Sequence, residues 1–242
     1  MAVVRHIVGM GGGGFSSEPD NPLLDDFVLS LAPRTPARLC FVPTASGDST
    51  NYLVKFYRAF RGRAVLDDLT LTGSAQLPRH PLQTSELEAF VLEQDVLYVG
   101  GGNTANMLAL WRTHGLDRVL RKAWEQGIVL AGLSAGLICW FEASLSDSFG
   151  PPAALHDGLG LLSGSACPHY DGDPARRELY RGLVAEGFPE GYAIDDGAAL
   201  HFEGTSLSQV VTSRPLARAY RLTRTSAAIS EEPLPTRYLG TK

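Results

Sequence analysis

Cysteine and long apolar runs are scarce in this chain of 242 residues. The three cysteines, Cys40, Cys139 and Cys167, are an odd number, lie far apart and form no CxxC pair. Neither a disulfide framework nor a cysteine-ligated zinc site is therefore expected, and the pattern is typical of a reducing cytoplasm. No apolar run reaches the roughly 18 to 20 residues that a membrane helix needs.

A targeting signal and a strong charge bias are also lacking. The N-terminal segment MAVVRHIVGMGGGGF has no apolar region followed by a small-residue cleavage site, so we expect it to form the first core strand. The formal net charge of -5 gives no reason to propose nucleic acid or an anionic membrane as a partner. With 44% hydrophobic and 19% charged residues, the chain should bury an ordinary core. The oligomeric state stays open, a homodimer included.

Short apolar runs alternate with longer amphipathic stretches in the first part of the chain. The runs that predict strands are Val3–Gly9, Arg38–Pro43, Ala64–Thr70, Val96–Gly100 and Ile128–Leu133. The stretches that predict helices lie near Pro22–Leu31, Tyr52–Arg61, Ser85–Leu92, Thr104–Arg112 and Leu116–Glu125. Strands separated by helices of this length form βαβ units, so we expect an α/β fold with three layers and a mostly parallel sheet.

The alternation of predicted strands and helices ends after Phe149. The stretch GPPAALHDGLGLLSG predicts a loop-rich insertion, and DPARRELYRGLVAEG predicts one more helix. Late strands within about residues 192–225 predict a small C-terminal antiparallel extension, and the tail from Ile229 is expected to be frayed. Because no internal repeat or low-complexity linker divides the chain, we expect a single domain over residues 1–242.

A run of glycines follows the first predicted strand. Gly9, Gly11 and Gly14 fit the pattern GxGxxG of dinucleotide-binding proteins. The context differs, because the turn-forming stretch FSSEPDNP follows where a helix should begin, and the second strand ends in CFVPTAS rather than in an acidic residue. We therefore favour a glycine loop that lines a cleft, and we expect no cofactor.

A second glycine loop, in YVGGGNTANML, ends a predicted strand. Asn103 or Thr104 can cap the helix that follows. Successive backbone N–H groups beside a helix N-terminus form an anion-binding cradle. The loop is therefore either a plain tight turn or a site for an oxyanion or a carboxylate.

The segment GLSAG, Gly132–Gly136, lies between an apolar strand and a helix-like stretch. This is the pattern of a nucleophile elbow, in which small neighbours allow a sharp turn and the central residue, Ser134, projects above the sheet. Ala135 could then offer its N–H to an oxyanion, with a second N–H from Gly101 or Gly102. The alternative is that Ser134 is only a small residue in a tight turn.

A nucleophilic serine needs a base, for which the chain offers six histidines. His169, in SACPHYDGD, follows a change from apolar to polar residues, where a base would face a cleft. His201, in ALHFEG, is the second candidate. His6 lies within a strand, and His114 ends a helix, where a cation is favourable. His80 lies in a proline-containing loop. Since the histidines and cysteines show no ligand spacing, no metal is expected.

The base in turn needs a carboxylate that orients it. In YAIDDGAAL, Asp195 and Asp196 start an apolar segment, and the alternation of a strand lets only one of them face the site. The order Ser134, His169, Asp196 differs from the order of the α/β-hydrolases, so an esterase of that fold is disfavoured.

Taken together and in this order, GGGNTANML, GLSAGLICWFE with SDS, CPHYD and AIDDGAAL resemble the motifs of the dipeptidase E (α-aspartyl dipeptidase) family of serine peptidases, which includes cyanophycinase-like members. The match runs from about Ile7 to His201. The resemblance implies a flavodoxin-like α/β fold similar to that of the class I glutamine amidotransferases, with serine in place of their cysteine. It also implies hydrolysis of peptides that have an N-terminal aspartate.

The resemblance further implies a role for individual residues. Ser134 corresponds to the nucleophile, His169 to the general base and Asp196 to the third member, for which Asp195 and Glu190, in FPEG, are rivals. The predicted substrate contacts are Gly102, Asn103, Asp147, Arg176 and Arg177. Among these, Asp147 would bind the free amine of the substrate, and either arginine could grip the side-chain carboxylate of its aspartate. The alternatives are a cyanophycinase-like or isoaspartyl peptidase, another acyl hydrolase, or a non-catalytic ligand-binding member.

Overall fold

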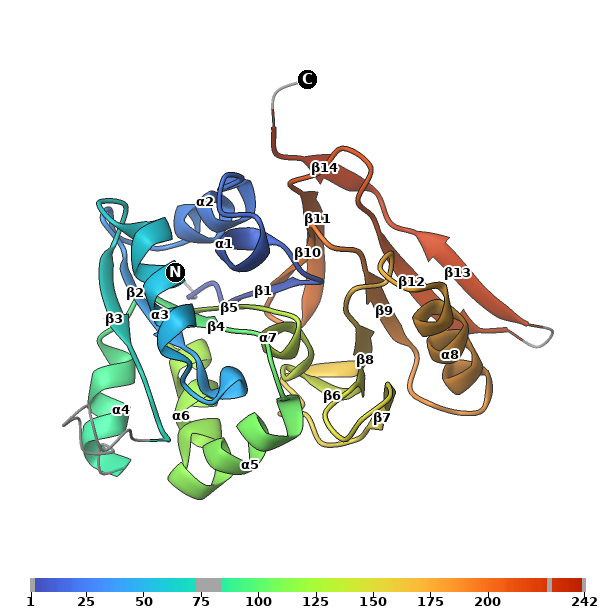
Figure 1. Ribbon diagram of the computed structural model, residues 1–242, viewed down its shortest axis with the longest axis horizontal. Helices are drawn as coiled ribbons and strands as arrows, with labels where there is room; N and C mark the ends of the chain where they lie inside the picture. Colours follow the sequence, from blue (N-terminus) through green and yellow to red (C-terminus); the bar gives the residue numbers. More distant parts are fainter. Residues whose placement is uncertain (1–2, 73–83, 226–227, 241–242) are drawn as a thin grey trace.

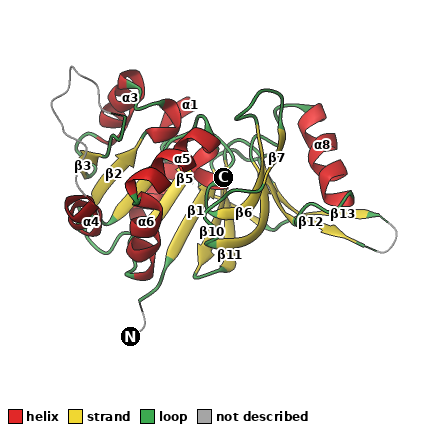
Figure 2. Ribbon diagram, turned by 90° about the horizontal axis from the view of Figure 1, so that it is seen from below, coloured by secondary structure: helices red, strands yellow, loops and turns green. Residues whose placement is uncertain are grey.

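In the computed structural model, which describes residues 3–72, 84–225 and 228–240, eight of the described strands form one mixed sheet with helices on both faces (Figures 1 and 2). Their order is β14-β11-β10-β1-β5-β4-β2-β3. The parallel strands that position the centre of this sheet are β1 (His6–Met10), β2 (Arg38–Val42), β3 (Val65–Asp68), β4 (Val96–Val99) and β5 (Val129–Leu133). The strands that extend it are β10 (Ala198–Glu203), β11 (Ser206–Thr212) and β14 (Thr236–Tyr238).

Apolar side chains bury both faces of this sheet. One face packs against α1 (Gly14–Ser17), α2 (Leu23–Ser30) and α3 (Thr50–Phe60), and its core includes Phe15, Phe41 and Phe56. The other face packs against α4 (Thr84–Leu92), α5 (Thr104–His114) and α6 (Leu116–Glu125). A short 3₁₀ turn, η1 (Thr44–Ser46), follows β2. The predicted three-layer α/β arrangement is confirmed, with element ends shifted by a few residues.

A second sheet follows the short helix α7 (Ala135–Ile138), and its strand order is β13-β12-β9-β8-β6-β7 among the described residues. Its strands are β6 (Phe141–Ser146), β7 (Ala153–Leu155), β8 (Leu162–Cys167), β9 (Gly191–Ile194), β12 (Ala219–Arg224) and β13 (Ile229–Pro233). Helix α8 (Pro174–Ala185) packs on this sheet, at the right in Figure 1.

The second sheet departs from the sequence-based expectation. The predicted loop-rich insertion contains β7 and the start of β8, because its apolar residues pair with β6. Of the late strands expected within about residues 192–225, β10 and β11 extend the first sheet, while β12 pairs antiparallel with β9 in the second.

The tail from Ile229 is not frayed, so that prediction was wrong. Strand β13 pairs with β12 along its whole length, and β14 lies parallel to β11. Between them, the N–H of Leu234 donates to the carbonyl of Ala219 at 2.8 Å. The backbone hydrogen bonds therefore hold this tail in place despite its prolines and glutamates. None of the helices in the described part of the chain is long and apolar enough to cross a membrane.

Candidate active site

Ser134 occupies the sharp turn between β5 and α7. Its backbone adopts φ 54° and ψ -110°, a conformation that a residue with a side chain rarely takes. The turn is possible because a glycine stands two residues before Ser134 and another two residues after it. A Cβ on Gly132 would overlap with the backbone of Gly136, and one on Gly136 would overlap with the backbone of Val99. The strained turn exposes the Ser134 hydroxyl at the carboxyl end of the sheet, where open α/β folds bind ligands.

His169 approaches this serine from the second sheet. It follows β8 after Pro168 and also has a positive φ, 54°. Its Nε2 lies 2.8 Å from the Ser134 Oγ. The N–H of the next residue, Tyr170, donates to the carbonyl of Ile194 at 3.1 Å. This hydrogen bond fixes the loop that contains His169 against the end of β9.

Asp196 lies in the connection from β9 to β10, where the chain crosses from the second sheet to the first. Its Oδ1 accepts a hydrogen bond from Nδ1 of His169 at 2.7 Å. This hydrogen bond lowers the pKa of Asp196 below its ordinary value. With Nδ1–H held by the carboxylate, Nε2 is left as the acceptor that faces Ser134. The structure thus brings Ser134, His169 and Asp196 together.

The two rival carboxylates bond elsewhere. Asp195 is buried and accepts the backbone N–H of Arg218 at 2.9 Å. Burial raises the pKa of Asp195 to about 6. Glu190 accepts the backbone N–H of Arg224 at 2.8 Å. Neither contacts His169, and Asp196 is the carboxylate that the geometry offers as its partner.

The N-terminal glycine loop lies against this histidine–carboxylate pair. Gly12 forms a bridge with Asp196, and its carbonyl accepts the N–H of Gly197 at 3.1 Å. A Cβ on Gly12 would overlap with Oδ1 of Asp196 and would lie 2.9 Å from Nδ1 of His169. The loop contacts His169 and Asp196, and Gly12 needs to be glycine so that these two side chains can meet. The unbroken run of four glycines was the signal that could have identified it.

The second glycine loop presents backbone N–H groups to the site. The N–H of Gly101, which was predicted to hold an oxyanion, donates instead to the Tyr52 hydroxyl at 3.3 Å. Within the described residues, the N–H groups of Gly102 and Ala135 donate to no protein group. The structure therefore favours Gly102 over Gly101 as the partner of Ala135. Asn103 caps α5 by accepting the N–H of Asn106 at 2.9 Å.

A pocket of about 300 Å³ opens beside the three residues. Its lining includes Ser134 and His169, together with Gly102, Asn103, Asp147 and Arg176. Arg176 and Asp147 form an ion pair with 3.8 Å between Nη2 and Oδ2; the arginine side chain is 12% exposed and the aspartate 64%. The pocket therefore offers one cation and one anion next to the serine hydroxyl.

Arg177 lies outside this pocket, which corrects its predicted role as a substrate contact. Successive residues on a helix point about 100° apart, so Arg177 faces another side of α8 than Arg176. Its guanidinium lies over the rings of Tyr170 and Tyr220 and pairs with Glu231. Glu231 also accepts the Tyr170 hydroxyl at 3.0 Å. This contact anchors the residue next to His169, and no motif in the sequence indicates it.

None of the other histidines in the described part of the chain lines this pocket. His201 is buried on β10 and contacts His6, while His114 ends α5. His80 lies outside the described residues.

The chain is similar to known proteins over most of its length. A family model described as peptidase family S51 matches residues 7–210. An uncharacterized peptidase, YgaJ, of Bacillus subtilis (strain 168) is 51% identical over 238 residues, which cover 98% of this chain and 100% of that protein. A protein named peptidase E of Streptomyces coelicolor is 30% identical over 180 residues, 69% of each chain. The crystal structure of a peptidase from an acI-B1 Actinobacterium has a TM-score of 0.70 at 19% identity, covering 97% of this chain and 96% of that one, and so shares the fold.

Proposed function

The chain belongs to peptidase family S51, and from this premise we propose that it is a serine exopeptidase that hydrolyses dipeptides and short peptides with an N-terminal aspartate. The observation that carries the proposal is the juxtaposition of Ser134 and His169 with the pair formed by Asp147 and Arg176 in one pocket.

The proposed reaction proceeds through an acyl-enzyme. The Ser134 Oγ attacks the carbonyl carbon of the aspartyl residue while His169 Nε2 takes the hydroxyl proton. The N–H groups of Ala135 and Gly102 hold the oxyanion that forms. His169 then gives the proton to the leaving amine as the peptide bond breaks. Water, deprotonated by the same imidazole, attacks the ester and releases aspartate, and the proton returns to Ser134.

Asp196 supports both halves of this reaction without giving up its charge. Its hydrogen bond to Nδ1 keeps Nε2 free to accept the proton, and the carboxylate stabilises the imidazolium that forms. Because the pKa of Asp196 is lowered, the carboxylate is ionised throughout the neutral range.

The charges in the pocket match those of the proposed substrate. An N-terminal aspartyl residue has an ammonium group and a carboxylate a few bonds apart. Asp147 can bind the ammonium, and Arg176 can bind the side-chain carboxylate in a bidentate manner. The substrate would then replace the contact between these two side chains. The small volume of the pocket, about 300 Å³, favours one such residue over a longer acyl segment.

An isoaspartyl peptide is the second candidate, because it presents the same two charges. Its scissile bond starts from the side-chain carbonyl, so the ammonium and the free carboxylate would be placed differently relative to Ser134.

A panel of Asp-X, β-Asp-X, Glu-X and Ala-X dipeptides tests the substrate. We expect kcat/KM to be highest for Asp-X, and cleavage of β-Asp-X alone would replace the proposal by the second candidate. In Arg176→Gln, kcat/KM for Asp-X should fall at least tenfold, while Arg118→Gln, an exposed arginine on α6, serves as the control. An equal loss in both variants would contradict the assigned contact.

A labelled fluorophosphonate that reacts at Ser134 would rule out a non-catalytic binding role. Hydrolysis of Asp-X retained in Ser134→Ala would overturn the acyl-enzyme mechanism. A cytoplasmic location stays a prediction.

A further inference from the structure

A second cluster of histidine and carboxylate side chains lies away from the proposed active site, at the other end of β1 and β10. His6 is the first residue of β1, and Glu203 is the last residue of β10. The two strands are antiparallel, and their register pairs His6 with Glu203 and Val8 with His201. Since side chains two residues apart on a strand share a face, all three polar side chains emerge on the same side of the sheet.

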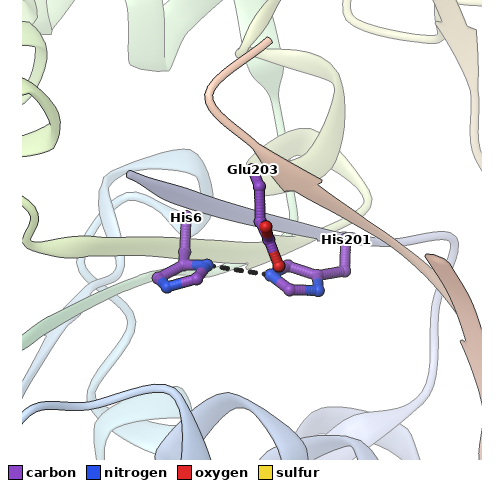
Figure 3. A group of neighbouring side chains, drawn as sticks. All are labelled: His6, His201 and Glu203. Atoms are coloured by element: carbon purple, nitrogen blue, oxygen red, sulfur yellow. Dashed lines mark hydrogen bonds between the residues drawn. The ribbon is translucent and has the colours of Figure 1, made fainter. Parts of the chain in front are cut away.

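The three side chains converge at their tips (Figure 3). Nδ1 of His6 lies 3.0 Å from Nε2 of His201, and a carboxylate oxygen of Glu203 lies with these nitrogens so that all three atoms are within 4.8 Å of one another. His201 is 1% exposed, His6 is half-buried and Glu203 is exposed. The ring of Phe27 on α2 covers His201, with 5.4 Å between the ring centroids.

We propose that His6, His201 and Glu203 bind a divalent transition-metal ion, Zn²⁺ in preference to Mg²⁺ or Ca²⁺, with water as the fourth ligand. Two imidazoles and one carboxylate form a ligand set typical of zinc, whereas magnesium and calcium prefer oxygen ligands. Bonds of about 2.0–2.1 Å to two histidine nitrogens in a tetrahedral site place these nitrogens about 3.3 Å apart. The 3.0 Å in the structure needs only a small adjustment of His6.

The exposed side of the cluster gives an ion a way in. Glu203 is near the turn to β11, where its Oε1 accepts the hydroxyl of Ser208 at 3.2 Å. An ion can therefore meet this carboxylate first and then displace the contact between the two imidazoles. The register between β1 and β10 is unbroken from His6 to His201, so the backbone between these two residues has no large rearrangement to make.

In the metal-free protein, one proton lies between Nδ1 of His6 and Nε2 of His201. A bound metal would displace this proton from its place between the two nitrogens. Arg237 Nε donates to the Gln209 Oε1 at 3.1 Å, so the Gln209 amide nitrogen faces Nδ1 of His201, at 3.2 Å. His201 therefore holds its proton on Nε2 and donates it to His6. When the metal takes the electron pair of Nε2, this proton moves to Nδ1. The Gln209 amide turns to accept it, which makes Gln209 a positioning residue for the metal. Both rings stay neutral, and no net proton is released.

The proposed metal would link β1 to β10. The same two strands meet at the active-site end through Gly12 and Asp196, five residues before His201. The metal therefore has a structural role and takes no part in the proposed hydrolysis. This inference does not depend on the substrate proposed above.

Calorimetric titration of chelator-treated protein with ZnCl₂ tests the site. We expect one Zn²⁺ per chain, and a rise in Tm on adding the metal. Co²⁺ should give the visible absorption bands of a tetrahedral nitrogen–oxygen site. Glu203→Gln changes an exposed side chain and should weaken binding at least tenfold without unfolding the protein, while His6→Ala should abolish it. Gln209→Ala should weaken binding about tenfold.

The variant His169→Ala distinguishes this site from the pair formed by His169 and Asp196, which could also bind Zn²⁺. Binding and the rise in Tm should persist in His169→Ala. The proposal is overturned if the wild-type protein binds no Zn²⁺, or if binding is lost in His169→Ala. It is also overturned if binding is unchanged in both Glu203→Gln and His6→Ala.

Discussion

Strand β10 has a histidine–carboxylate cluster at each end, and the backbone holds the two clusters in different ways. At the start of the strand, Ser134 and His169 adopt positive φ angles in turns, and the side chains of His169 and Asp196 are 38% and 32% exposed. At its other end, His6 and His201 lie on the paired strands β1 and β10, and His201 is almost fully buried.

The difference shows what the backbone adds to the same side-chain chemistry. Turns at the carboxyl ends of strands bring groups from different elements around a pocket, at a cost in strain that the packing must offset. Neighbouring strands bring groups together by register alone, without positive φ angles at the two histidines. The first arrangement suits a reaction with a changing substrate, and the second suits a permanent bond.

The largest effect is expected from Ser134→Ala, which changes the cluster whose backbone is strained. Loss of the nucleophile should lower kcat for Asp-X by about 10⁴-fold or more. The Tm should stay the same or rise, because alanine keeps the small side chain. Steady-state kinetics together with a melting curve checks both, and a large fall in Tm would show that the serine has a structural role.

Asp196→Asn should have the next largest effect, a fall in kcat of about 10³- to 10⁴-fold. An amide can donate to Nδ1 and so favour the wrong tautomer of His169. Asp195→Asn is the matched control on the neighbouring residue, and its activity should fall less than tenfold. If Asp195→Asn were the more damaging variant, the orienting carboxylate would be misassigned.

Gly12→Ala should lower kcat by about 10²-fold, because the added methyl group forces Asp196 and His169 apart by a fraction of an ångström or more. As a control, Gly182→Ala on α8 meets nothing within 4 Å and should stabilise the helix by about 0.5–1 kcal/mol without loss of activity. Full activity in Gly12→Ala would mean that the loop yields to the methyl group.

A buried acid beneath the same glycine loop should make stability depend on pH. Asp25 accepts the Tyr98 hydroxyl at 2.9 Å, and burial raises its pKa to about 6. Because the folded state holds this proton more tightly than the unfolded state, stability should fall as pH rises from about 4 to 6 and then level off, by up to about 3 kcal/mol. Urea unfolding across this range should show the slope, and Asp25→Asn should reduce it, leaving the part that comes from Asp195.

The smallest effect is expected in the cluster of His6, His201 and Glu203, at the other end of β10. In metal-free protein, His201→Leu leaves His6 and Gln209 without their shared partner and should lower the free energy of unfolding by about 2 kcal/mol. His114→Ala, at the end of α5, should cost less than about 1 kcal/mol. Any loss of activity in His201→Leu should follow the fraction of unfolded protein. A specific loss of kcat would mean that the two ends of β10 are coupled.

The first sheet and the approximate positions of its helices could be predicted because each strand is a short apolar run followed by a turn. Ser134, His169 and Asp196 could be singled out for a related reason, since each follows a strand. The second sheet could not be predicted, because the apolar residues around β6 fit a helix as well as a strand. The sequence also could not show which of Arg176 and Arg177 faces the pocket, because this depends on the rotation of α8 about its axis. The contact of His6 with His201 joins residues 195 positions apart and depends on strand register alone.

The crossing of the chain from the second sheet to the first, at Asp196, links catalysis to folding. Ser134 comes from one sheet, His169 from the other, and Asp196 from the segment between them. A chain in which only the parallel strands β1 to β5 have formed therefore has a serine with neither base nor orienting carboxylate. Under the proposed mechanism, activity requires both sheets to be formed and docked, so its onset during refolding would report that docking.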